Sequence, residues 1–192
     1  RHLDLHFDHQ KAAAGKSGLP TRLDPALISR EVLTKEAKIN QLEIEIDDLA
    51  IKLLALQQPM AVDLRLITAA LKINNDLERM GDQAVNISER ALSLNQEPQL
   101  KPYIDIPRMA EIAQSVVKDG RDAVVNKHSK LARSVCERDD LVDGLNDQVV
   151  RELLTYMYGD SQMIGRAIHL MIICRCLERI ADHATNLAED VI

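Results

Sequence analysis

The sequence predicts an all-α protein made of two tandem, pseudo-symmetric three-helix bundles, and three observations lead to this fold class. The segment at residues 76–89 returns without a gap at residues 176–189, an offset of 100. Apolar residues recur at helical spacing in both halves, and no alternating strand pattern appears. Aromatic residues make up only 2% of the chain, so its core must consist of aliphatic residues, which suit closely packed helices.

The repeated segment matches mainly at polar positions. Its identical pairs are Leu77/Leu177, Glu78/Glu178, Arg79/Arg179, Asp82/Asp182, Ala84/Ala184, Asn86/Asn186 and Glu89/Glu189. A packing requirement alone would select apolar residues, so we expect the repeat to carry the function.

The first half of the chain, residues 1–95, contains two clear helices. Asp24 and Pro25 supply an N-cap and a first helical residue, and apolar residues follow at helical spacing until Pro59 ends this helix and opens the next. The second helix runs to the end of this half. A three-helix bundle needs one more helix in this half, and that helix would have to lie in residues 1–19. We therefore expect the N-terminal helix of this bundle to be incomplete in this chain.

The second half, residues 96–192, contains three helices. A proline-rich linker, Asn95–Pro107, separates it from the first half. The periodicity predicts helices over residues 107–127 and 129–158. Gly159 ends the second of these, and the last helix runs to the C-terminus.

Bulk properties exclude several classes of function. A formal net charge of −6 and the scarcity of aromatic residues argue against nucleic-acid binding. The three cysteines have no zinc-like spacing and are typical of reduced thiols. No run approaches the roughly 20 apolar residues that span a bilayer, and the N-terminus has no signal-peptide stretch. We therefore expect a cytoplasmic protein without direct membrane insertion.

Acidic and amide side chains form pairs spaced by four residues, so both members of a pair lie on one helix face. Each half has two such pairs on adjacent helices. The candidate metal ligands are Glu36, Asn40, Glu78 and Asp82 in the first half, and Asp139, Asp143, Glu178 and Asp182 in the second. Carboxylates that converge repel one another, and a bound cation relieves that repulsion.

The residue types also bear on the metal. All-oxygen ligation suits Mg²⁺, Ca²⁺ and Mn²⁺, while His183 extends the choice to iron or zinc. Solvated helix faces also carry such pairs, with Arg79 and Arg179 near enough to neutralise them, but repetition in register favours a site. Asn40 gives the first bundle one fewer negative charge, so we expect the second bundle to bind a cation more readily.

The segments at residues 57–66, 75–82 and 177–183 resemble the PhoU family of phosphate-uptake regulators, and the match covers about residues 22–192. The resemblance implies two symmetric three-helix bundles that bear metal ions on the acidic pairs. It further implies a cytoplasmic, homodimeric adaptor between a phosphate ABC transporter ATPase subunit and a sensor histidine kinase. Such an adaptor represses the phosphate-starvation response when phosphate is plentiful.

Two other readings remain open. A ferritin-like di-metal enzyme needs Glu-x-x-His pairs that project into the bundle core, but Ala181 stands three residues after Glu178. A plain helical interaction module would bind no metal. We find no phosphate-binding loop and no nucleophile arrangement, so we expect a protein that is not an enzyme.

Overall fold

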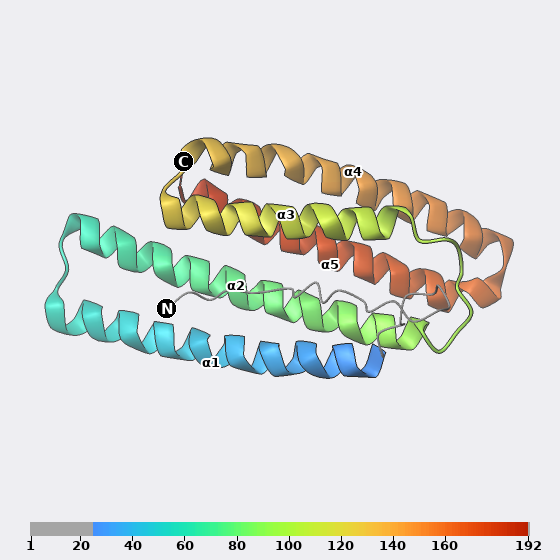
Figure 1. Cartoon of the computed structure of the whole chain (residues 1–192), viewed down its shortest axis with the longest axis horizontal. Coiled ribbons are helices and arrows are strands. Elements are labelled where there is room, and N and C mark those ends of the chain that lie inside the picture. The colour runs from blue at the N-terminus through green and yellow to red at the C-terminus, as the bar shows by residue number, and fades with distance from the viewer. Residues whose placement is uncertain (1–24, 192) are drawn as a thin grey trace, which may run out of the picture.

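The computed structural model describes residues 25–191, and these form helices joined by short connections (Figure 1). The elements are α1 (Pro25–Gln57), α2 (Ala61–Leu94), α3 (Asp105–Asn126), α4 (Ser129–Gly159), the short 3₁₀ turn η1 (Ser161–Met163) and α5 (Ile164–Glu189). No strand occurs within the described range. The all-α prediction is confirmed.

The helices run roughly along one long axis in two groups (Figure 1). Helices α3, α4 and α5 pack against one another and form a three-helix bundle, which we call the C-terminal unit. Among the described helices, α1 packs on α2 alone, and this pair forms the N-terminal unit. Helix α2 in turn lies against α5. The counterpart of α3 in the first bundle, predicted for residues 1–19, falls outside the described residues.

The helix ends follow local chemistry. His128 precedes α4, and its Nδ1 accepts a hydrogen bond from the Leu131 N–H at 2.9 Å. Asp160 caps η1 by accepting from the Gln162 N–H at 2.8 Å. Helix α3 begins two residues earlier than predicted, so Pro107 lies in its first turn, where a missing N–H breaks no helical bond. Helix α2 begins at Ala61 rather than at Pro59.

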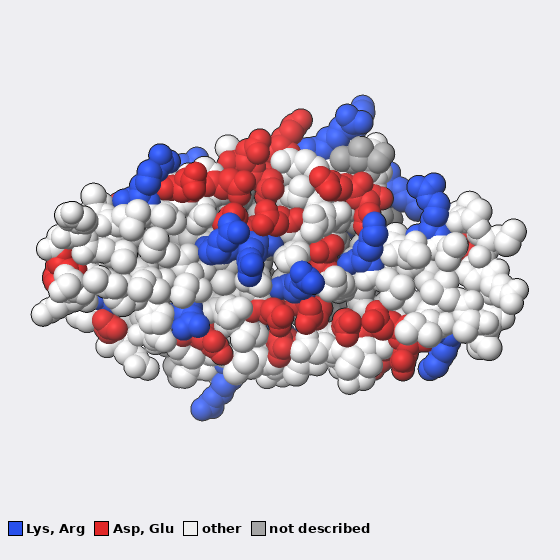
Figure 2. Space-filling view, turned by 180° about the vertical axis from the view of Figure 1, so that it is seen from behind, with Lys and Arg blue, Asp and Glu red and all other residues white. Residues whose placement is uncertain are grey.

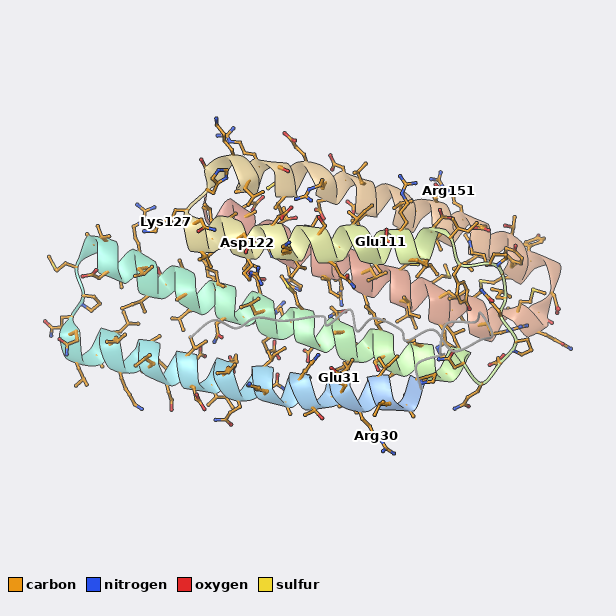
Figure 3. All side chains as sticks on the ribbon, viewed as in Figure 1. Arg30, Glu31, Glu111, Asp122, Lys127 and Arg151 are labelled. Atoms are coloured by element: carbon orange, nitrogen blue, oxygen red, sulfur yellow. The ribbon has the colours of Figure 1, made fainter. Side chains whose placement is uncertain are left out.

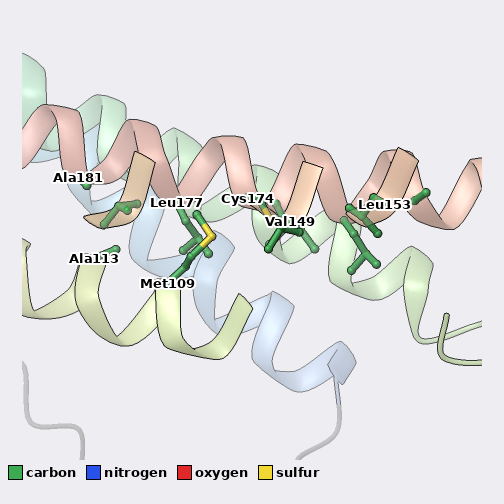
Figure 4. Packing of buried hydrophobic residues seen from close by; sticks show 11 residues of the cluster. Met109, Ala113, Val149, Leu153, Cys174, Leu177 and Ala181 are labelled. Carbon is green, nitrogen blue, oxygen red and sulfur yellow. The ribbon is translucent and has the colours of Figure 1, made fainter. Parts of the chain in front are cut away.

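The core of the C-terminal unit lies between its three helices. Met109 of α3 is fully buried beside Leu177 of α5, as Figure 4 shows. Val149 and Leu153 of α4 belong to the same cluster and are also fully buried. At Gly120 a Cβ would lie 3.0 Å from the Ala184 carbonyl oxygen, so glycine permits the close approach of α3 to α5.

Helix α2 is fixed to α5 by apolar and polar contacts. Met80 is 9% exposed and packs against a further group of buried apolar residues in the C-terminal unit. Asp76 of α2 lies 2.8 Å from His183 Nδ1 and accepts a second bond from Asn186 at 3.3 Å. Lys72 forms an ion pair with Asp190 at 3.3 Å. These contacts hold the two repeated segments against each other.

The two units differ in how much apolar surface they bury. Leu177 is 7% exposed, whereas its repeat partner Leu77 is 41% exposed. Charged side chains such as Arg30 of α1 and Arg151 of α4 project outward (Figure 3). Of the helices in residues 25–191, none is long and apolar enough to cross a membrane.

Candidate metal centre

Three predicted ligands meet where α4 lies against α5. Asp139 and Asp143 are one helical turn apart on α4, and Asp182 faces them from α5. Each contributes a carboxylate oxygen, and these three oxygens all lie within 4.8 Å of one another. Hard divalent cations prefer such oxygen donors. We call these three residues the C-terminal trio.

The C-terminal trio is electrostatically unfavourable without a cation. The pKa of Asp139 rises from 3.8 to about 6, chiefly because the carboxyl is buried and then because Asp182 and Asp143 repel its charge. Burial and the charge of Glu178 also raise the pKa of Asp143. One Asp139 oxygen, Oδ1, is buried and has no hydrogen-bond partner among residues 25–191. A buried, unpartnered carboxylate oxygen fits a position that accepts a cation.

The fourth predicted ligand of this unit, Glu178, lies beside Asp143 but has other partners. Asn146 Nδ2 donates to Glu178 Oε2 at 2.8 Å, and Arg175 Nη1 pairs with Oε1. The Glu178 side chain is 12% exposed. Its two oxygens are therefore held by protein donors, and its ligation of a metal stays a prediction.

His183 does not belong to the C-terminal trio. Its Nδ1 faces Asp76 of α2, and the grouped ligand atoms are carboxylate oxygens only. The possibility that His183 widens the metal choice to iron or zinc therefore gains no support from that nitrogen. Hard cations such as Mg²⁺ and Mn²⁺ suit the donors that are present.

The corresponding residues of the N-terminal unit are arranged differently. Asn40 Nδ2 donates to Glu36 Oε1 along α1. On α2, the pKa of Glu78 is raised by burial first, then by the charges of Asp82 and Glu43. Within residues 25–191, the C-terminal trio alone forms a group of three closely spaced metal-ligating side chains. The i,i+4 pairs are thus present in both units, but among residues 25–191 three ligand oxygens come close together only in the C-terminal unit.

The sequence reasoning missed two residues near these clusters. In the C-terminal unit, Asn146 donates a hydrogen bond to Glu178. In the N-terminal unit, the negative charge of Glu43 contributes to the raised pKa of Glu78. Both lie three residues after the i,i+4 pair of their own helix, at positions that correspond when α1 is aligned with α4. That alignment was the signal available in the sequence.

Acidic side chains also gather on the surface. On the face opposite to that in Figure 1, acidic side chains gather in two patches, one toward α4 and one toward α1 (Figure 2). Basic side chains lie between the two patches (Figure 2). Each unit therefore presents its own negative region rather than sharing one.

Known proteins match this chain in sequence and in structure. The PhoU domain family model matches residues 21–91 and again residues 106–191. A phosphate-specific transport system accessory protein PhoU homolog of Aquifex aeolicus is 47% identical over 152 residues, which cover 79% of this chain and 69% of that protein. A Caulobacter vibrioides protein of the same name is 44% identical over 163 residues, covering 84% and 71%.

Solved structures of PhoU proteins are also similar to this chain. The crystal structure of PhoU from Pseudomonas aeruginosa superposes with a TM-score of 0.84 at 38% identity and covers 88% of this chain and 81% of that one. The phosphate transport system regulatory protein PhoU from Streptococcus pneumoniae gives 0.75 at 25% identity, with 86% and 77% covered. The two family matches coincide with the two units of the fold. This chain belongs to the PhoU family, as a phosphate transport accessory protein with two PhoU domains.

Proposed function

We propose that this protein is a cytoplasmic, metal-binding adaptor that couples a phosphate ABC transporter to a sensor histidine kinase. In this role it lowers phosphate-starvation signalling when phosphate is plentiful. Family membership supports the phosphate-regulatory part, because the relatives are named as accessory proteins of phosphate transport. The convergence of Asp139, Asp143 and Asp182 is the observation that supports metal binding.

In this proposal the C-terminal trio holds a hard cation through carboxylate oxygens. The buried Asp139 Oδ1, which has no hydrogen-bond partner in the described part of the chain, fits such a ligand. The bound cation supplies positive charge that cancels the repulsion among the three carboxylates. It thereby ties α4 to α5 at a point where the metal-free protein is under electrostatic stress.

The same geometry favours a structural cation over a catalytic one. The trio lies at the edge of the bundle, with Asp143 exposed, whereas the core between α3, α4 and α5 is filled by apolar side chains such as Met109 and Val149. A ferritin-like di-metal enzyme places its ligands inside the bundle core. We therefore propose that the protein regulates by contact with its partners and turns over no substrate.

Genetics and binding test the adaptor role. Deletion of the gene should leave phosphate-starvation genes active in phosphate-rich medium, because the kinase loses its restraining partner. Purified protein should bind the transporter ATPase subunit or the kinase and should show no phosphatase turnover. Normal repression in the deletion strain, or metal-dependent turnover by the purified protein, would contradict the proposal.

The proposal also includes a homodimer, as the family resemblance implies. Light scattering of the purified protein should give twice the mass of one chain. A single-chain mass at micromolar concentration would remove the dimer from the proposal and leave the adaptor role to be tested by the partner assays.

A further inference from the structure

We infer that two copies of this chain pair through α1, with an exposed apolar row of one α1 packed antiparallel against the same row of the other. The inference rests on the homodimer of the proposed function and deepens it, because it assigns the surface of that dimer and the direction in which the two helices run.

The apolar row on α1 has the spacing of a coiled-coil seam. Its residues alternate at intervals of four and three, and they are Leu42, Ile46, Leu49, Leu53 and Leu56. The same alternation continues back along the helix to Ile28, with Lys35 as the one polar residue in the series. This spacing keeps side chains on one helix face, and a lone polar residue within such a row fixes the register of a pair. We call the five listed residues the α1 seam.

The α1 seam is open in the single chain. The exposed fraction of its residues runs from 37% at Leu42 to 76% at Leu56. Val149 of α4, the counterpart of Ile46, is fully buried in a cluster with Met109 of α3. Among residues 25–191, no third helix covers α1 in this way, and α1 lies at the edge of the molecule in Figure 1. A contiguous exposed row of this kind marks an interaction surface.

The C-terminal unit indicates how a helix would lie on the seam. Helix α3 ends at Asn126 and α4 begins at Ser129, so the two neighbours run antiparallel. A hollow beside the seam, lined by Ile46, by Leu66 and Ala70 of α2 and by Val124 of α3, extends the apolar surface. A helix that takes the corresponding place on α1 would therefore also run antiparallel to it.

The charges beside the α1 seam identify that helix as α1 of a second copy. Glu31, Lys38, Glu45 and Lys52 are all exposed and stand seven residues apart along one flank, with alternating sign. This flank faces away from α2, since Asp47 on the other side of α1 accepts a hydrogen bond from Asn74 of α2 at 3.2 Å.

The alternating charges are complementary to themselves. When two α1 helices run antiparallel about a centre between residues 38 and 45, Glu31 faces Lys52 of the second copy. Lys38 then faces Glu45 of the second copy, and two-fold symmetry repeats both contacts. An unrelated partner would not require this pattern on α1.

The surface is large enough for a stable dimer. Helices α1 and α2 contain 33 and 34 residues. Each is therefore about 50 Å long and about 10 Å wide, so one face of the pair measures about 1,000 Å². A stable interface of standard size buries about 800 Å² on each partner.

The test measures the dissociation constant of the dimer of the full chain by sedimentation velocity over a range of concentrations. Leu49→Asp places a charge within the α1 seam and should weaken the dimer about tenfold or more. The matched control is Ile51→Asp: Ile51 is 59% exposed, against 58% for Leu49, but lies off the seam. It should change the constant by less than about twofold. Circular dichroism of each variant confirms that the helices are intact.

A charge exchange tests the antiparallel direction. Lys38→Glu should weaken the dimer about threefold or more, because it sets a glutamate against Glu45 of the second copy at two symmetric contacts. Adding Glu45→Lys restores opposite charges and should return the constant to within about twofold of the wild type. Residues 38 and 45 are seven positions apart, beyond the three or four that bring side chains of one helix together, so a contact within one chain does not explain the rescue.

Each outcome decides the inference. Equal effects of Leu49→Asp and Ile51→Asp on a dimeric protein overturn the surface and leave the proposed homodimer standing. A Lys38→Glu defect that Glu45→Lys fails to rescue overturns the antiparallel pairing. A single-chain mass for the wild type overturns the surface and the homodimer together, and assigns the α1 seam to residues 1–24 of the same chain or to a different protein.

Discussion

The C-terminal and N-terminal clusters have the same spacing of polar residues on equivalent helices, yet they present their oxygens differently. In the C-terminal unit, Asp139, Asp143 and Asp182 converge, and none of the described residues forms a hydrogen bond with Asp139 Oδ1. In the N-terminal unit, Asn40 already donates to Glu36. Sequence spacing brings such side chains to one face, but the partner of each side chain decides whether the site is ready for a cation.

One physical difference between the two units is the preorganisation of their oxygen atoms. A cation at the C-terminal trio meets carboxylates that are already close and whose mutual repulsion raises the pKa of Asp139. A cation at the N-terminal unit must compete with the Asn40–Glu36 hydrogen bond. Ligands that are held in place before binding cost less to organise, so we expect the C-terminal unit to bind more tightly.

The largest expected effect concerns the cores that carry the two clusters. Leu177→Ala should lower the free energy of unfolding by about 2–5 kcal/mol, because this side chain is 7% exposed within a filled core. The repeat-equivalent Leu77→Ala should cost about 1 kcal/mol or less, since Leu77 is 41% exposed. Urea unfolding measures both. Equal losses would show that the units are equally closed in solution.

The next effect concerns the C-terminal trio itself. Asp139→Asn should weaken Mn²⁺ binding at this site about 10- to 100-fold, because a charged ligand becomes a neutral amide. Asp140→Asn is the matched control: it removes the same charge from the adjacent, exposed position and should change affinity by less than about twofold. Calorimetric titration measures both. A similar loss in the two variants would assign the effect to general charge rather than to ligation.

A smaller effect is a pH dependence of stability in chelator-treated protein. The pKa of Asp139 is raised from 3.8 to about 6 in the folded state, so the fold favours the protonated carboxyl. The stability that this protonated group contributes is fully present below about pH 3.8 and is lost as the pH rises through about 6. Asp139→Asn should therefore stabilise the metal-free protein at pH 7.5 by about 1–2 kcal/mol, a figure reduced for solvent screening. The gain should vanish near pH 4. Urea unfolding at the two pH values checks this, and a pH-independent difference would contradict it.

The helices and the C-terminal trio followed from local rules. Apolar periodicity and caps located α1 to α5 within about three residues, although the 3₁₀ turn η1 before α5 was not predicted. The duplicated segment and the i,i+4 spacing singled out Asp139, Asp143 and Asp182. These features depend on residues close in sequence, which a single chain displays directly.

What the sequence left out depends on contacts between helices. The engagement of Glu178 by Asn146 and the turn of His183 toward Asp76 are set by how α4, α5 and α2 pack. Glu43 lies three residues after Asn40 on α1, outside the i,i+4 spacing that predicted the candidate ligands.

The most direct test compares repeat-equivalent substitutions in one titration. Mn²⁺ is titrated into the wild type, Asp182→Asn and Asp82→Asn, and the tightest binding event is followed in each. We predict that Asp182→Asn removes this event, because it removes one ligand of the C-terminal trio. Asp82→Asn should leave the tightest event intact and weaken only the weaker binding at the N-terminal unit. Equal loss of the tightest event in both variants, or no Mn²⁺ binding by the wild type, would contradict the assignment of a preorganised cation site to the C-terminal unit.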